Sequence, residues 1–136
     1  MLNLTPALRD AMVATCIRAL PNEGCGLILG RAAGDDATVT EVVASPNVAV
    51  SARIYEVDSR VLFQAFRRAD VEGLSVLGVF HSHTHSEAYP SPTDVRQAPD
   101  PQWHYILVSL RDIPAVVRSF RIEGDTVTSE DIYIED

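Results

Sequence analysis

The sequence predicts an α/β fold in which helices pack against a largely antiparallel or mixed β-sheet. The apolar run at residues 74–80 is typical of a buried strand, and two other stretches carry apolar residues at helical spacing. Several short segments separated by turn residues indicate hairpins. With 136 residues, 46% of them hydrophobic, the chain is long enough to bury one globular core.

The first half of the chain reads as a helix followed by a hairpin. Thr5 is a favourable N-cap, Pro6 fits the first helical position, and Pro21 ends the helix. A short apolar strand is expected at 25–30. The turn residues at 34–36 then lead into a partner strand at 38–44.

The second half begins with a short strand expected at 54–57. Asp58 or Ser59 caps the next helix, which ends near Gly73. The buried strand at 74–80 precedes a short helix that runs from Pro92 towards Ala98. Strands at 104–110, 115–121 and 126–134 complete the sheet, so the helices are expected to flank it.

Composition argues against several classes of partner. Eleven Lys and Arg residues against nineteen Asp and Glu residues give a net charge of −8, which disfavours nucleic acid and anionic membrane surfaces. The N-terminal residues lack a basic region and a long apolar run, so we expect a cytoplasmic protein. In that compartment Cys16 and Cys25 are expected to be small buried side chains without a disulfide. A nucleophilic role for Cys25 has no surrounding motif to support it.

The main functional signal follows the buried strand. His81-Ser82-His83 is separated by seven residues from Ser91-Pro92-Thr93-Asp94. Alternation along a strand points the two histidines the same way, and imidazoles are common zinc ligands. Asp94 adds a third, anionic ligand. Three protein ligands leave a fourth position open, as in catalytic zinc sites.

Asp94 also fits a purely structural interpretation. Ser91 as N-cap, Pro92 at the first helical position and Asp94 at the third match a capping box. The two interpretations are compatible. A helix that begins here would fix the Asp94 carboxylate in its first turn and hold the Ser91 hydroxyl beside it.

The joint pattern resembles that of the JAMM (MPN-plus) metalloprotease family, which places a glutamate upstream of His-Ser/Thr-His-x7-Ser-x2-Asp. Residues 81–94 match this motif without a departure, and Glu23 stands where the upstream acid is expected. The resemblance covers nearly the whole chain, so it implies one domain over residues 1–136. It also implies a curved β-sheet flanked by helices, related to the cytidine-deaminase fold. The string is closest to a bacterial subgroup that hydrolyses the adduct between a ubiquitin-like sulfur-carrier protein and cysteine.

The resemblance assigns roles to the site residues. One zinc ion is held by His81, His83 and Asp94, Glu23 is the general base, and Ser91 donates to the oxyanion. The alternative interpretation of Glu23 is a solvated surface acid, although a carboxylate just past a helix C-terminus is poorly placed for stability.

Two further residues near the motif have open roles. We expect His85 on the substrate side or supporting a ligand from behind. A three-histidine site that includes His85 is the alternative. Tyr89 is expected either to line the groove or to pack on the loop.

The leading function is therefore a zinc peptidase. It cleaves after the C-terminal Gly-Gly of a ubiquitin-like sulfur carrier and releases cysteine for cysteine biosynthesis. One alternative is an isopeptidase that removes ubiquitin-like modifiers from lysine, although 136 residues leave little room for the insertions of chain-specific enzymes. Another is a non-catalytic MPN scaffold, against which the intact ligand set argues. A deaminase is disfavoured because the chain has no Cys-x-x-Cys. A homodimer is compatible with the sequence.

Recognition of the carrier tail is expected to use a strand edge. An extended tail can add main-chain hydrogen bonds to such an edge, and residues 53–57 are the candidate segment. Gly-Gly suits a close passage over the metal because a Cβ atom beside the scissile bond would clash with Ser82 and Tyr89.

Overall fold

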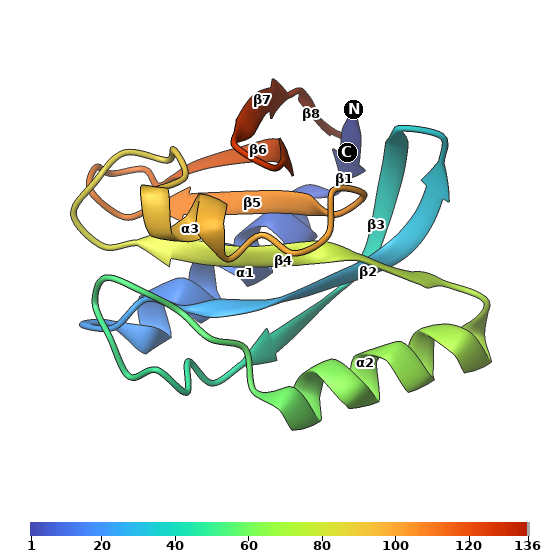
Figure 1. The fold of residues 1–136 in the computed structure, drawn as a ribbon, viewed down its shortest axis with the longest axis horizontal. Coiled ribbons are helices and arrows are strands. Elements are labelled where there is room, and N and C mark those ends of the chain that lie inside the picture. Colours follow the sequence, from blue (N-terminus) through green and yellow to red (C-terminus); the bar gives the residue numbers. More distant parts are fainter. Residues whose placement is uncertain (136) are drawn as a thin grey trace.

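The computed structural model describes residues 1–135 and confirms the α/β class (Figure 1). An eight-stranded sheet carries two long helices and one short one. The helices are α1 (Pro6–Ala19), α2 (Ser59–Glu72) and α3 (Pro92–Arg96). The strands are β1 (Leu2–Leu4), β2 (Cys25–Ala33), β3 (Asp36–Ser45), β4 (Ser75–His83), β5 (His104–Ser109), β6 (Val116–Glu123), β7 (Thr126–Glu130) and β8 (Ile132–Ile134).

The sheet is mixed and strongly curved. Its strand order is β7-β6-β5-β4-β2-β3-β1-β8, with β4–β5, β1–β3 and β1–β8 parallel and the other pairs antiparallel. Strands β7 and β8 stand at opposite ends of this order, yet only Asp131 separates them in the chain. The sheet must therefore curl until its two edges nearly meet, and Figure 1 shows β7 and β8 next to each other.

The two long helices bury opposite faces of this sheet. Met12 and Cys16 of α1 pack in a core with Phe80 of β4. Ala65 and Ala69 of α2 pack in the other core, with β2, β4 and β5 side chains that include Leu27, Val79 and Tyr105. Residues 27 and 28 of β2 belong to different cores, as the alternation of a strand requires.

The predicted boundaries of the two long helices are confirmed, whereas α3 begins at Pro92 as predicted but ends at Arg96, before Ala98. Thr5 accepts a hydrogen bond from the Leu8 amide at 3.2 Å, and Pro6 is the first residue of α1. Asp58 is the N-cap of α2, and Gly73 ends that helix with a φ of 68°, in the left-handed region where glycine avoids the penalty of a Cβ atom.

The prediction of a strand at 54–57 is wrong. This segment forms one isolated bridge, between Asn47 and Val57, and is otherwise loop. The Asn47 side chain meets its backbone groups instead: Oδ1 accepts from the Ala49 and Glu56 amides, and Nδ2 donates to the Ile54 carbonyl. The Asn47 side chain therefore makes hydrogen bonds that a neighbouring strand would otherwise make with this backbone.

Two other differences concern the sheet edges. β1 was not expected because three residues carry too little periodicity to be recognised. The strand expected at 126–134 is interrupted at Asp131, where the chain passes from one edge of the sheet to the other.

Candidate active site

The end of β4 and the start of α3 bring three polar side chains together. His81 and His83 are 3% and 5% exposed, and strand alternation points them to the same face. Ser91 and Asp94 form the predicted capping box: Asp94 N donates to Ser91 Oγ at 3.1 Å, and Ser91 N donates to Asp94 Oδ2 at 2.9 Å. The cap therefore fixes the Asp94 carboxylate, which is 6% exposed, opposite the two imidazoles.

The three groups converge on one point. Asp94 Oδ2 lies 3.1 Å from His81 Nε2 and 3.0 Å from His83 Nε2. One potential ligand atom from each residue lies within 4.8 Å of the others. Two atoms bound at about 2.0–2.1 Å to one tetrahedral ion are roughly 3.4 Å apart, so the observed spacing is close to that of a ligand set.

The hydrogen bonds around His83 test whether these residues fit a metal ion. His83 Nδ1 lies 2.8 Å from the Glu87 carbonyl oxygen, which can only accept, so Nδ1 carries a proton. In the neutral ring Nε2 then presents a lone pair to the Asp94 carboxylate. His81 Nε2 is buried and has no hydrogen-bond partner of adequate geometry. A cation between these acceptor atoms resolves the conflict, so the donor set fits a metal.

The electrostatics of the metal-free cluster follow from the same contacts. Burial lowers the pKa of His81 despite its contact with Asp94. Burial acts in the same direction on His83, but the interactions with Asp94 and the Glu87 carbonyl outweigh it and raise the pKa of His83. Burial opposes ionisation of Asp94 too. However, the two histidines and the Ser91 amide hold the pKa of that carboxyl well below its usual range.

Glu23 stands beside this cluster with an unpartnered oxygen. Its side chain is buried, being 2% exposed, and Oε1 makes no hydrogen bond with the described part of the chain. Burial is the main cause that raises the pKa of Glu23 to about 8, with His83 lowering it and Asp94 raising it. A buried carboxyl whose pKa lies near neutrality is well suited to exchange protons.

Ser82 has a role that sequence reasoning missed. Its side chain points away from the histidines, and Ser82 Oγ accepts a hydrogen bond from Gly24 N at 2.8 Å. Ser82 N donates to Gly24 O at 3.0 Å. These two hydrogen bonds connect Gly24, which follows Glu23, to Ser82, which lies between the two histidines. A Cβ atom at Gly24 would lie 2.6 Å from Cys16 Cα, so only glycine allows α1 to pack this closely.

A second support comes from the loop at 46–57. Asn47 Nδ2 donates to Glu23 O at 3.0 Å, and Glu23 N donates to Ser51 O at 2.8 Å. The Tyr55 ring stacks on His81, with 4.1 Å between ring centroids and 18° between planes. No spacing rule in the sequence links these residues, although the turn-forming residues 45–47 mark the end of the preceding strand and the start of the loop.

A cavity of about 560 Å³ lies over the cluster and receives several of the predicted residues. Glu23, His83, His85 and Ser91 all line it. His85 Nδ1 lies 2.9 Å from Thr84 Oγ1, and His85 is outside the group of converging ligand atoms. Tyr89 is 48% exposed and its ring packs edge-on against Phe120, 5.4 Å between centroids.

The cysteines are buried and free, as expected. Burial raises the pKa of Cys25 to about 11, which keeps this thiol protonated at neutral pH. Among residues 1–135, none of the helices has the length and apolar content that crossing a bilayer requires.

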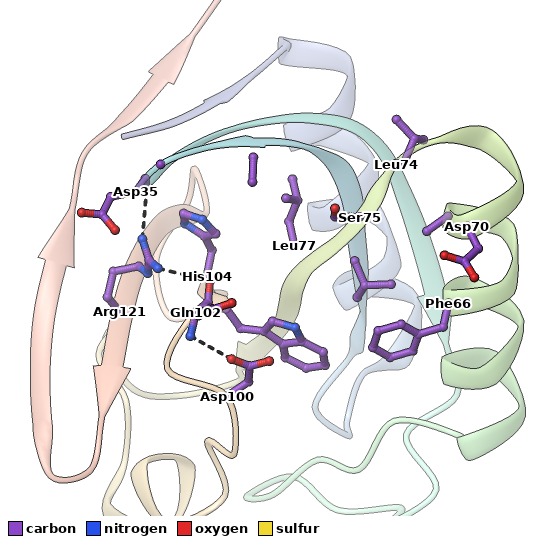
Figure 2. Close-up of a pocket in the computed structure, with 15 residues that line it drawn as sticks. Asp35, Phe66, Asp70, Leu74, Ser75, Leu77, Asp100, Gln102, His104 and Arg121 are labelled. Carbon is purple, nitrogen blue, oxygen red and sulfur yellow. Dashed lines mark hydrogen bonds between the residues drawn. The ribbon is translucent and has the colours of Figure 1, made fainter.

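A second cavity, of about 510 Å³, lies at the opposite end of β4 (Figure 2). It also contains a buried histidine, His104, whose Nδ1 lies 2.6 Å from Glu130 Oε1. Ser119 Oγ donates to the same oxygen at 2.8 Å. Figure 2 shows Arg121 beside His104, where its guanidinium donates to the carbonyls of Asp35 and Gln102.

Residues 5–123 match the family model described as prokaryotic homologs of the JAB domain. The chain belongs to this family. Membership confirms the expected JAMM relationship. A prokaryotic JAB relative, the CysO-cysteine peptidase of Mycobacterium tuberculosis, is 36% identical over 128 residues, which are 93% of this chain and 86% of the relative. A probable TtuB-protein conjugate cleaving protease of Thermus thermophilus is 38% identical over 62% of this chain and 55% of the relative.

Solved structures support the prokaryotic JAB fold. A protein from Desulfitobacterium hafniense aligns with a TM-score of 0.93 and 37% identity, covering 100% of this chain and 94% of that one. A JAB1/MPN domain protein from Archaeoglobus fulgidus aligns with a TM-score of 0.62 at 20% identity over the full length of both chains. The predicted curved sheet flanked by helices is therefore confirmed.

Proposed function

We propose that this protein is a zinc-dependent peptidase. It hydrolyses the amide bond after the C-terminal Gly-Gly of a ubiquitin-like sulfur-carrier protein and releases cysteine. The observation that carries the proposal is the convergence of three buried acceptor groups beside Glu23, whose Oε1 has no partner in the described chain. The peptidase relative named for a carrier–cysteine substrate supports the choice of bond.

His81, His83 and Asp94 would hold one zinc ion, a metal that accepts nitrogen and carboxylate ligands. When bound, zinc acts as a Lewis acid and makes water more acidic near neutral pH. The protein's own part is to orient the ligands. The Glu87 carbonyl fixes the His83 tautomer, the capping box fixes Asp94, and Tyr55 limits rotation of the His81 ring.

Glu23 would move the proton. Its carboxylate accepts a proton from the attacking water and passes it to the nitrogen that leaves, so the cleaved amide yields a free carrier carboxylate and a free amine. The hydrogen bonds to both sides of the Glu23 peptide keep the carboxylate over the cavity. Positive charge at the ligand cluster would lower the pKa of Glu23 from about 8 and so favour the form that accepts a proton.

Ser91 would stabilise the oxyanion. Its Oγ accepts from Asp94 N, which leaves the hydroxyl hydrogen free to donate into the cavity. Such a hydroxyl would supply a donor where negative charge develops on the carbonyl oxygen. His85 lines the same cavity and would contact the substrate. For Tyr89, packing on Phe120 supports a structural part in the loop.

The isopeptidase alternative shares all of this machinery, and relatives named for conjugate cleavage and desampylation keep it open. Carrier recognition through a strand edge at 53–57 is abandoned because that segment is loop. Strand β4, which carries the two histidines, offers no free edge either, since it pairs with β2 on one side and β5 on the other. The expected flanking of this path by Ser82 and Tyr89 is also wrong, because Ser82 is buried against Gly24 and Tyr89 packs on Phe120. The Gly-Gly requirement rests instead on the cavity that Ser91, Ala52 and Arg53 line together.

The test uses a ubiquitin-like carrier that ends in Gly-Gly and carries one cysteine in amide linkage. We expect hydrolysis to free carrier and cysteine, measured by intact mass, loss of activity in chelator, and recovery on adding zinc. An adduct whose last glycine is replaced by valine should be cleaved at least about a hundredfold more slowly, the cost of misplacing the reacting bond. Equal rates for the two adducts, or full activity in chelator, would contradict the proposal.

A further inference from the structure

Arg53 is the one arginine that lines the cavity over the metal cluster. The cavity otherwise presents the carboxyl of Glu23, two histidines and small polar side chains. The Arg53 side chain is exposed and forms no ion pair or side-chain hydrogen bond within residues 1–135. Arg53 is therefore the one guanidinium of the cavity that is free to bind an anionic group of a substrate.

The backbone that carries Arg53 is tied to Glu23. Ser51 Oγ accepts from Arg53 N at 3.0 Å and from Ile54 N at 3.3 Å, which closes a tight turn. The Ser51 carbonyl accepts from Glu23 N at 2.8 Å and from Asn47 Nδ2 at 3.3 Å. The backbone of Arg53 therefore lies two residues after Ser51, the residue whose carbonyl binds the amide of Glu23, the proposed general base.

We propose that Arg53 binds the free α-carboxylate of the residue that is released. This inference rests on the proposed function and narrows its substrate class to carriers linked to the α-amino group of a C-terminal amino acid. In such an adduct the carboxylate is two bonds from the scissile nitrogen, at the edge of the cavity. A guanidinium binds a carboxylate with two parallel hydrogen bonds, which gives both charge neutralisation and orientation.

The same contact discriminates against lysine isopeptides. Their scissile nitrogen is followed by a chain of methylene groups, so no carboxylate lies near it. Without Arg53, the carboxylate of a cysteine adduct would enter the cavity beside Glu23 with no arginine in the lining to bind it. The reaction itself is unchanged: the C–N bond breaks, water supplies hydroxyl to carbon and hydrogen to nitrogen, and the carboxylate stays ionised throughout.

The test compares two adducts that differ in one group. One carries cysteine with a free carboxylate after Gly-Gly, and the other carries cysteine carboxamide. The wild type should prefer the carboxylate by roughly tenfold to a hundredfold in kcat/KM, the usual worth of a charged hydrogen bond. Because the carboxylate is present before and during the reaction, the difference should appear mainly in KM.

Variants assign the preference to Arg53. Arg53→Ala should slow the carboxylate adduct to the rate of the carboxamide and leave the carboxamide unchanged, while Arg53→Lys should restore part of the preference. Arg31→Ala is the matched control, because Arg31 is an exposed arginine of β2 far along the strand from Cys25, which pairs with His81. It removes the same charge and should keep the full preference.

The outcomes separate this inference from the proposed function. Equal rates of the wild type on the two adducts, or an equal loss on both in Arg53→Ala, would overturn the role of Arg53 while leaving the peptidase intact. A wild type that cleaves neither adduct, or that cleaves them in chelator, would overturn the proposed function itself.

Discussion

The sheet holds two buried histidine–carboxylate clusters, one at the start of β5 and one at the end of β4, and they differ in how their hydrogen bonds are met. In the first cluster, His104 Nδ1 and Ser119 Oγ both contact Glu130 Oε1, so donors face an acceptor. In the second cluster, Nε2 of His81 and Nε2 of His83 both lie against the Asp94 carboxylate, and His81 Nε2 makes no hydrogen bond of adequate geometry. The first cluster is complete within the protein, whereas the second is compatible with a bound cation.

Burial alone does not distinguish the clusters, because both are nearly inaccessible. What distinguishes them is the match of donors and acceptors. In the His104 pair, burial opposes ionisation of Glu130, but hydrogen bonds from His104 and Ser119 lower the pKa of that carboxyl below its usual value. Glu23, near the other cluster, has no such donors and its pKa rises. The missing hydrogen-bond donors around Glu23 therefore set it apart from Glu130, whose carboxylate is hydrogen-bonded within the protein.

The largest expected difference between the two clusters is their effect on the rate of hydrolysis. Glu23→Gln should lose roughly 10²–10⁴ in the rate of adduct hydrolysis, the usual contribution of a positioned base, and should still bind zinc. Glutamine keeps the shape of the side chain but cannot accept the proton. Steady-state rates on the carrier–cysteine adduct measure the effect. A Glu23→Gln enzyme as fast as the wild type would place the base elsewhere.

A change in the His104–Glu130 cluster should lower the stability of the protein and leave its activity unchanged. Glu130→Ala leaves His104 and Ser119 without their buried acceptor and should lower the free energy of unfolding by about 3 kcal/mol. Urea denaturation gives this value, and hydrolysis measured well below the unfolding transition should be unchanged. Normal stability together with lost activity would reverse our assignment of the two clusters.

A smaller effect concerns pH in the chelator-treated protein. The pKa of Glu23 is about 8 in the fold and ordinarily 4.5, so between these values the folded state holds a proton that the unfolded state has released. Stability should therefore fall as pH rises through this window, by at most about 1.4 kcal/mol per pH unit from this group. Urea denaturation at pH 5.5, 6.5 and 7.5 should show a weaker decline in Glu23→Gln. Parallel profiles would contradict the shift.

The convergence of the proposed metal ligands was predictable because their signal is local. His81 and His83 share a strand face, and Ser91 to Asp94 form a self-contained cap, so short spacings determine both placements. The supports of Glu23 were not predictable. Asn47 and Ser82 meet it across 24 and 58 residues, counted to Glu23 and Gly24 respectively, and such pairings depend on the folded sheet.

The segment at 54–57 shows how this limit produces an error. Its apolar residues suit a strand, but the Asn47 side chain satisfies the backbone groups that a strand would pair. Strand β3 already pairs with β2 on one edge and with β1 on the other. Local propensity was therefore overridden by a side-chain contact, and the same contact placed Tyr55 on His81 and Arg53 at the cavity.

Calorimetric titration of the chelator-treated protein with zinc tests the central claim most directly. The wild type, Glu130→Ala and His85→Ala should each bind one zinc ion per chain. Asp94→Ala should bind far more weakly while retaining the circular dichroism spectrum of the folded domain, because the core does not depend on a metal. A wild type that binds no zinc, or an Asp94→Ala variant that binds it as tightly as the wild type, would contradict the account.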